Sequence, residues 1–341
     1  MPLNGDLKSR FRLQMQGAMS LNVAYIGIVN GLFAALHRHG AASIEVMAET
    51  AGMDGEYVRR WCDAAYAFGY LDEAEGQFHL TPSGLAMRPE AAESLMPIAV
   101  QHMLSAHMAE RAAALMRTGV RPGEQVLAER ETILPWFGPM LEASFARFFE
   151  RTICPAIPIF REVDARGGLV VDLGCGNGWY LRALARNFPA VRGLGFDGFA
   201  ENIAQATRLA RAEALGTRVS FQAKDVHGLA LTEKADLIAM SRALHHVWEA
   251  GPRDFLVSLR DNLQSDGAVV IWEPNWPSAR RGLRTPGAQC LAFQNLTEHV
   301  QGNHLLRADE IESEIRMAGL VTETYLFAEG LEVVVVGRKV S

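Results

Sequence analysis

The sequence predicts an α/β protein with a mostly parallel, doubly wound sheet in its C-terminal half and a helical domain before it. From residue 165 onward, short apolar runs alternate with helical patterns, which is typical of a parallel sheet covered by helices on both faces. Before that point, apolar residues recur at spacings of three and four, which indicates helices. Near the end, Val321–Phe327 and Leu331–Val336 flank Ala328-Glu329-Gly330, which predicts an antiparallel hairpin at the sheet edge.

Composition excludes several classes of protein. Hydrophobic residues make up 49% and charged residues 21% of the 341-residue chain, a balance that can form a full core. The net charge of −6 argues against a nucleic-acid surface. The four cysteines lie far apart without a CxxC pair. Neither a zinc knuckle nor a disulfide framework follows from that spacing, which favours a reducing compartment. We therefore expect a cytoplasmic protein without a nucleic-acid partner.

The most apolar early stretch, Leu21 to Leu36, contains polar and glycine positions and lacks a small-residue cleavage site. It predicts a buried helix rather than a signal peptide or membrane span, so no membrane partner is expected. Helix starts follow at Ser43 and Asp54, where each side chain can cap a helix. A turn at Glu75-Gly76 then predicts a small hairpin.

This order of helices and hairpin predicts a winged-helix-like domain over residues 1–95. Such a domain either binds DNA or mediates dimerisation. The expected recognition helix carries Glu56, Arg59, Arg60 and Asp63, whose charges cancel, so we favour dimerisation and predict a homodimer. Residues 96–164 are predicted to be connecting helices. Residues 165–341 are predicted to form the ligand-binding sheet domain.

The predicted parallel strands follow one another after residue 165. They are Leu169–Leu173, Gly193–Asp197, Val219–Gln222, Ala235–Met240 and Ala268–Glu273. The first ends in a glycine-rich turn, VVDLGCGNG over residues 170–178, that opens a helix near Trp179. Glycines let the backbone turn tightly and approach a ligand, while the helix start presents free N–H groups. The turn therefore predicts a nucleotide-like ligand.

Acidic residues stand at the ends of three successive strands. Asp172 lies within the end of the first strand, where a structural strand rarely holds a charge. Asp197 ends the second strand and is placed to accept hydrogen bonds from two ribose hydroxyls. Asp225 follows the third, and with Val226 it suits an adenine amino group and ring. The three acids meet at one carboxyl edge of the sheet.

On these motifs the chain resembles the class I S-adenosylmethionine (SAM)-dependent methyltransferases, over roughly residues 165 to 338. The resemblance implies a Rossmann-like sheet and SAM as cofactor. The residues implied to bind SAM are Asp172, Gly174, Gly176, Asn177, Asp197, Asp225, Val226 and Ser241. It also implies a small-molecule methyl acceptor.

Two resemblances compete for the acceptor. The segment Ser241–Trp248, SRALHHVW, is similar to that of small-molecule O-methyltransferases, which dimerise through a winged helix and use a general base at the position of His245. The segment 293–304, FQNLTEHVQGNH, looks like that of metal-dependent 2-oxo acid C-methyltransferases. That resemblance implies a divalent metal, iron or zinc, held by His245 and His299, with His246 and His304 as neighbouring alternatives.

The preferred interpretation is methylation at C3 of a small 2-oxo acid chelated to the metal, in specialised amino-acid biosynthesis. His246 is a candidate for removing the C3 proton, and Arg130 for pairing with the acceptor's carboxylate. The alternative is metal-independent O-methylation with His245 as general base. A third, different class is a regulator that binds DNA and senses SAM.

Overall fold

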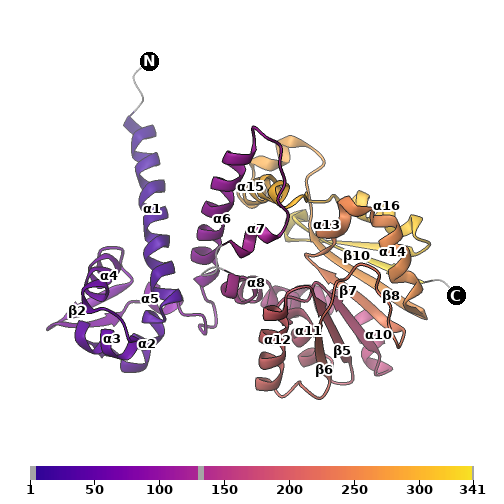
Figure 1. Ribbon diagram of the computed structural model, residues 1–341, viewed down its shortest axis with the longest axis horizontal. Helices are drawn as coiled ribbons and strands as arrows, with labels where there is room; N and C mark the ends of the chain where they lie inside the picture. The colour runs from indigo at the N-terminus through magenta and orange to yellow at the C-terminus, as the bar shows by residue number, and fades with distance from the viewer. Residues whose placement is uncertain (1–4, 130–133, 340–341) are drawn as a thin grey trace. The chain divides into compact units, whose positions relative to one another are not determined.

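The computed structural model describes residues 5–129 and 134–339. The chain divides into two compact units, which Figure 1 colours by residue number. Unit 1 contains Met1–Glu110 and Arg130–Ser144, and unit 2 contains Arg111–Glu129 and Phe145–Ser341. The predicted connecting segment, residues 96–164, is thus shared between the two units.

Unit 1 consists of helices and one small antiparallel sheet of order β1-β3-β2. Its elements are α1 (Gly5–Val29), α2 (Leu32–His39), β1 (Ala41–Ala42), α3 (Ile44–Ala51), α4 (Gly55–Ala67), β2 (Leu71–Ala74), β3 (Gln77–Leu80) and α5 (Pro82–Ala86). The predicted caps and hairpin are present. Asp54 accepts hydrogen bonds from the backbone N–H groups of Glu56 and Tyr57, both at 3.0 Å. Glu75 and Gly76 both have positive φ, as a two-residue hairpin turn requires.

The predicted helix through Leu21 to Leu36 is wrong in one respect, because the structure breaks it at Asn30-Gly31. Gly31 adopts φ +66°, a left-handed conformation that ends α1 and lets α2 begin at a different angle. Among the described residues, no single helix is long and apolar enough to cross a membrane. Only α1 and α2 taken together, bent by 68°, reach that length and composition.

Unit 2 is built on a seven-stranded sheet of order β6-β5-β4-β7-β8-β10-β9 (Figure 1). The strands are β4 (Leu169–Leu173), β5 (Arg192–Asp197), β6 (Val219–Ala223), β7 (Ala235–Ser241), β8 (Leu263–Pro274), β9 (Val321–Phe327) and β10 (Glu332–Arg338). The first five run parallel, whereas β10 pairs antiparallel with both β8 and β9. The predicted fold class is confirmed, including its terminal hairpin.

Helices of unit 2 cover this sheet, and the long helix α15 follows its fifth strand, β8. The helices of this unit are α7 (Gln125–Ala128), α9 (Cys154–Ala156), α10 (Ile159–Ala165), α11 (Trp179–Asn187), α12 (Ala200–Ala212), α13 (Leu244–Val247), α14 (Pro252–Asp261), α15 (Pro286–Gln301) and α16 (Ala308–Met317). Helices α6 (Met96–Leu115) and α8 (Leu134–Phe148) have residues in both units. In unit 2, α14 and α16 pack against Val171, Ile238, Val269 and Val335, which form the core of one sheet face. The rigid sheet holds the strand ends that carry the site.

Candidate active site

The glycine-rich turn joins β4 to α11 with three glycines at positive φ: Gly174, Gly176 and Gly178. A Cβ at Gly174 would lie 2.8 Å from the Cβ of Ala243, and one at Gly178 would lie 2.5 Å from the ring of Phe221. These two positions therefore need glycine for packing. A Cβ at Gly176 would meet no described atom within 4 Å. The backbone at Gly176 is thus open to a ligand.

Asp172 is a buried carboxylate without a hydrogen-bond partner among the described residues. The residue is 1% exposed, and neither of its carboxyl oxygen atoms has a hydrogen-bond partner among the described residues. Burial, together with the nearby charge of Asp197, raises its pKa well above the ordinary value. Because a buried carboxylate without a partner is costly, its geometry points to a cationic ligand group beside it. The ammonium and sulfonium groups of SAM have this charge.

Asp197 organises the end of β5. Its Oδ2 accepts from the backbone N–H of Gly176 at 2.9 Å, and its Oδ1 accepts from Phe199 N–H at 2.9 Å and from Asn202 Nδ2 at 3.0 Å. Asn177, also buried, accepts from the backbone N–H of Trp179 at 3.3 Å, just before α11 begins. Asp197 thus ties the glycine-rich turn to the neighbouring strand.

The remaining predicted cofactor residues line the same strand ends. Asp225 follows β6 with an exposed side chain, and its Oδ1 accepts from the backbone N–H of His227 at 2.9 Å. Val226 is partly buried against the sheet core. The hydroxyl of Ser241, at the end of β7, is buried and has no hydrogen-bond partner among the described residues. The structure therefore brings acids, glycines and an open polar group to one edge, a set that fits SAM.

A histidine–carboxylate pair occupies the next two strand ends. His245 on α13 is 2% exposed, and its Nδ1 lies 2.8 Å from Oε2 of Glu273, which is 1% exposed at the end of β8. Oε1 of Glu273 accepts from the backbone N–H of Leu244 at 2.7 Å. Glu273 was not among the predicted site residues, although it ends a predicted strand as Asp197 does. The carboxylate fixes the ring and leaves Nε2 as the nitrogen that can react.

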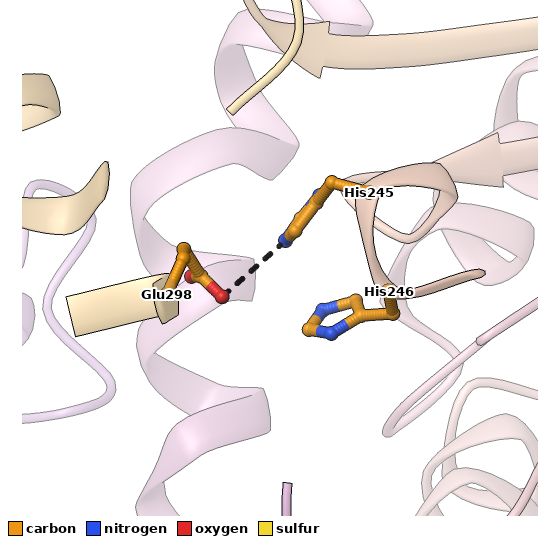
Figure 2. Close-up of side chains that lie close together, drawn as sticks. All are labelled: His245, His246 and Glu298. Carbon is orange, nitrogen blue, oxygen red and sulfur yellow. Dashed lines mark ion pairs between the residues drawn. The ribbon is translucent and has the colours of Figure 1, made fainter. Parts of the chain in front are cut away.

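Glu298, on α15, faces that nitrogen. Its Oε2 lies 3.9 Å from His245 Nε2, the contact that is dashed in Figure 2. Burial alone would lower the pKa of His245, but the carboxylates of Glu273 and Glu298 outweigh it and raise the pKa to about 9. For Glu273, burial would raise the pKa, but the charges and hydrogen bond of its histidine neighbours lower it. The pair is therefore mostly imidazolium and carboxylate at neutral pH.

His246 lies beside His245, with ring centroids 4.1 Å apart (Figure 2). Its Nδ1 is 2.8 Å from Oε1 of Glu124 and 2.9 Å from Nδ2 of Asn303. One ligand atom each from His245, His246 and Glu298 lies within 4.8 Å of the others, so these three residues are close enough together to hold a metal ion. Glu124 comes from the segment before α7, far away in sequence, and no local pattern could have predicted it.

The structure does not bring His299 into this group. His299 is exposed on α15, whereas its neighbour Glu298 is buried and faces His245, a difference of one residue along the helix. His304 instead pairs with Glu249, at 2.9 Å. Arg130, the predicted partner of an acceptor carboxylate, lies outside the described residues.

The chain is similar to known methyltransferases. Residues 170–267 match a family model described as a methyltransferase domain. A trans-aconitate 2-methyltransferase of Streptomyces avermitilis is 32% identical over 105 residues, which are 31% of this chain and only 38% of that protein. O-methyltransferase SfmM3 of Streptomyces lavendulae is 27% identical over 282 residues, 80% of each chain.

The fold also has solved relatives. Human N-acetylserotonin methyltransferase, solved in complex with SAM, superposes with a TM-score of 0.75 over 100% of both chains, at 17% identity. At that identity the likeness concerns the fold alone. Residues 170–267 match a methyltransferase domain, and the relative that covers most of the chain is also a methyltransferase. Together these findings support a SAM-dependent methyltransferase.

Proposed function

We propose that the chain transfers a methyl group from SAM to a hydroxyl oxygen of a small molecule, with His245 as general base. The observation that carries this proposal is the buried His245–Glu273 pair at 2.8 Å. The relative that spans 80% of the chain is an O-methyltransferase, which adds support. This proposal replaces our first preference, C3 methylation of a 2-oxo acid, with the alternative drawn from the sequence.

The cofactor residues prepare the reaction by binding and orientation. Asp172 is placed for a cationic group and Asp197 for ribose hydroxyls. The open backbone at Gly176 would lie against bound SAM, and Asp225 with Val226 would hold its adenine. When bound, SAM supplies an electrophilic methyl group on its sulfonium sulfur. These residues would orient bound SAM at the carboxyl edge of the sheet, where α13 begins.

The acceptor side then handles one proton. Neutral His245 accepts the hydroxyl proton at Nε2 as the oxygen–methyl bond forms and the sulfur–methyl bond breaks. Glu273 keeps Nδ1 protonated and stabilises the imidazolium that results. Glu298 lies 3.9 Å from Nε2 and adds further negative charge beside that cation. Loss of methyl transfer in His245→Ala, with SAM binding retained, is the direct test.

A second candidate is metal-dependent C3 methylation of a 2-oxo acid. It is favoured by the group His245, His246 and Glu298, whose ligand atoms lie within 4.8 Å of one another. Two imidazoles and one carboxylate suit iron or zinc and leave open positions for a bidentate acceptor. These three residues, rather than the predicted pair His245 and His299, would hold the metal. A chelator separates the candidates, because only the second loses activity when metal is removed.

We further propose a cytoplasmic homodimer that does not bind DNA. Within unit 1, α1 exposes a series of large apolar side chains, as an interface would. They are Phe11, Leu13, Met15, Met19 and Ile26. On α4, the predicted recognition helix, Arg59 and Arg60 pair with Glu45 and Glu56 of the same chain, which leaves no free basic face there for DNA phosphates.

A further inference from the structure

We propose that Glu124 is a positioning residue that makes His246 a second acceptor-binding group, with Nε2 as its free nitrogen. The proposal rests on the proposed function only in placing the acceptor beside His245. Glu124 lies just before α7, and the backbone N–H of Gly123 donates to the carbonyl of Val300 on α15 at 3.4 Å. This contact fastens the segment to the helix that carries Glu298.

The two contacts at His246 Nδ1 decide which nitrogen carries the proton. A carboxylate oxygen only accepts hydrogen bonds, so Glu124 at 2.8 Å requires a proton on Nδ1. Asn303 Nδ2, at 2.9 Å, cannot then donate to the same atom. A half-turn of the Asn303 amide exchanges its nitrogen and oxygen without moving the rest of the side chain. With Nδ1 protonated, the arrangement that satisfies the hydrogen bonds has the Asn303 oxygen facing the ring. Glu124 therefore selects the tautomer of neutral His246 with a free Nε2.

His246 then repeats the arrangement of His245. In both, a carboxylate holds Nδ1, and Nε2 has no hydrogen bond within 3.5 Å among the described residues. The rings lie 4.1 Å apart at 36°. His245 accepts the proton of the reacting hydroxyl, and His246 accepts a hydrogen bond from a neighbouring donor. The geometry points to an acceptor with two hydroxyl groups on adjacent carbons, one methylated and one held.

The segment offers a matched control. Glu129 pairs with Arg111 at 3.3 Å and has the same side-chain exposure as Glu124, 41%, but does not contact His246. Glu124→Ala removes the Nδ1 partner. Glu124→Gln retains a carbonyl oxygen that can accept from Nδ1 and should restore the tautomer.

The test is long-range ¹H–¹⁵N correlation NMR spectroscopy of the full chain with ¹⁵N-labelled histidine. The signals of His246 are identified as those lost in the His246→Asn variant. We expect neutral His246 to be protonated at Nδ1 in wild type, Glu129→Ala and Glu124→Gln, but to become a tautomer mixture in Glu124→Ala. Added 1,2-dihydroxybenzene should shift the Nε2 signal, with affinity about tenfold weaker in Glu124→Ala. An unchanged tautomer in Glu124→Ala, or no Nε2 shift in wild type, would overturn the proposal. Methyl transfer retained in His245→Ala would refute the proposed function alone.

Discussion

Nδ1 of His245 lies 2.8 Å from Oε2 of Glu273, and both side chains are almost fully buried. The same carboxylate accepts from the backbone N–H of Leu244 at 2.7 Å, so it holds both the ring and the first turn of α13. Glu273, at the end of β8, therefore sets the position and tautomer of the proposed base and, together with Glu298, its charge.

This pair predicts a rate that rises with pH. Since the pKa of His245 is raised to about 9, its proton must leave before Nε2 can accept another. We expect kcat/KM to increase about tenfold per pH unit from pH 7 and to level near pH 9. Glu273→Gln removes the charge that raises the pKa, so its plateau should begin at lower pH, with a reduced maximum. A profile that is flat in wild type, or unmoved in Glu273→Gln, would disprove the role of the pair.

Asp172→Asn should stabilise the cofactor-free protein while weakening SAM binding. The carboxylate is buried and has no partner among the described residues, so a neutral side chain of the same size should raise the free energy of unfolding by about 1 kcal/mol. SAM affinity should fall about tenfold, because a cationic group loses its counter-charge. Thermal unfolding with and without SAM measures both effects.

The gain in stability of Asp172→Asn should vanish below about pH 3.8, where the carboxyl group of Asp172 is protonated in folded and unfolded chains alike. Asp309→Asn, at an exposed carboxylate paired with Arg307, is the control and should change neither quantity appreciably. A less stable Asp172→Asn protein with normal SAM affinity would mean that Asp172 is structural.

Asp197→Ala should weaken SAM binding by about 1.5–3 kcal/mol, the loss expected for charge-assisted hydrogen bonds to ribose. Asp197 also accepts hydrogen bonds from Gly176, Phe199 and Asn202. We therefore predict an additional loss of stability of about 1–3 kcal/mol. Calorimetry measures the affinity for SAM, and urea unfolding measures the stability of the protein. Unchanged SAM affinity would show that Asp197 does not contact the ribose.

Much of the fold could be predicted from the sequence because periodicity and turn residues are local signals. The predicted first strand, Leu169–Leu173, matches β4 residue for residue, and the terminal hairpin lies where Ala328-Glu329-Gly330 placed it. The break between α1 and α2 was missed. The apolar period continues across Asn30-Gly31, although the positive φ of Gly31 ends α1 there.

The acceptor side was less predictable, because it joins distant segments. Glu273 had a readable signal, since the rule that singled out acids at strand ends applies to it as well. Glu298 was missed by one position, because resemblance placed the ligand on His299 and sequence alone does not show which face of α15 is buried. Glu124 reaches His246 across 122 residues, and only the folded chain brings the two together.

The homodimer prediction can be tested on α1. Sedimentation should give about 75 kDa, twice the 37.4 kDa of one chain. The double variant Phe11→Asp and Met15→Asp should shift the protein to monomer, because it places charges among exposed apolar side chains. Tyr57→Asp, at an 81% exposed position on α4, should leave the dimer intact. A wild-type monomer at micromolar concentration would refute the prediction.

The central claim is methyl transfer to oxygen with His245 as base and without a metal. Its most direct measurement uses SAM labelled in the methyl group, chelator-treated protein and two acceptor panels, small hydroxylated aromatics and 2-oxo acids. We predict label on a hydroxyl oxygen at full rate in the stripped protein, and a loss of at least a hundredfold in His245→Ala with unchanged SAM affinity. Label found only on a 2-oxo acid, and only after iron or zinc is restored, would contradict the claim and establish the metal-dependent alternative.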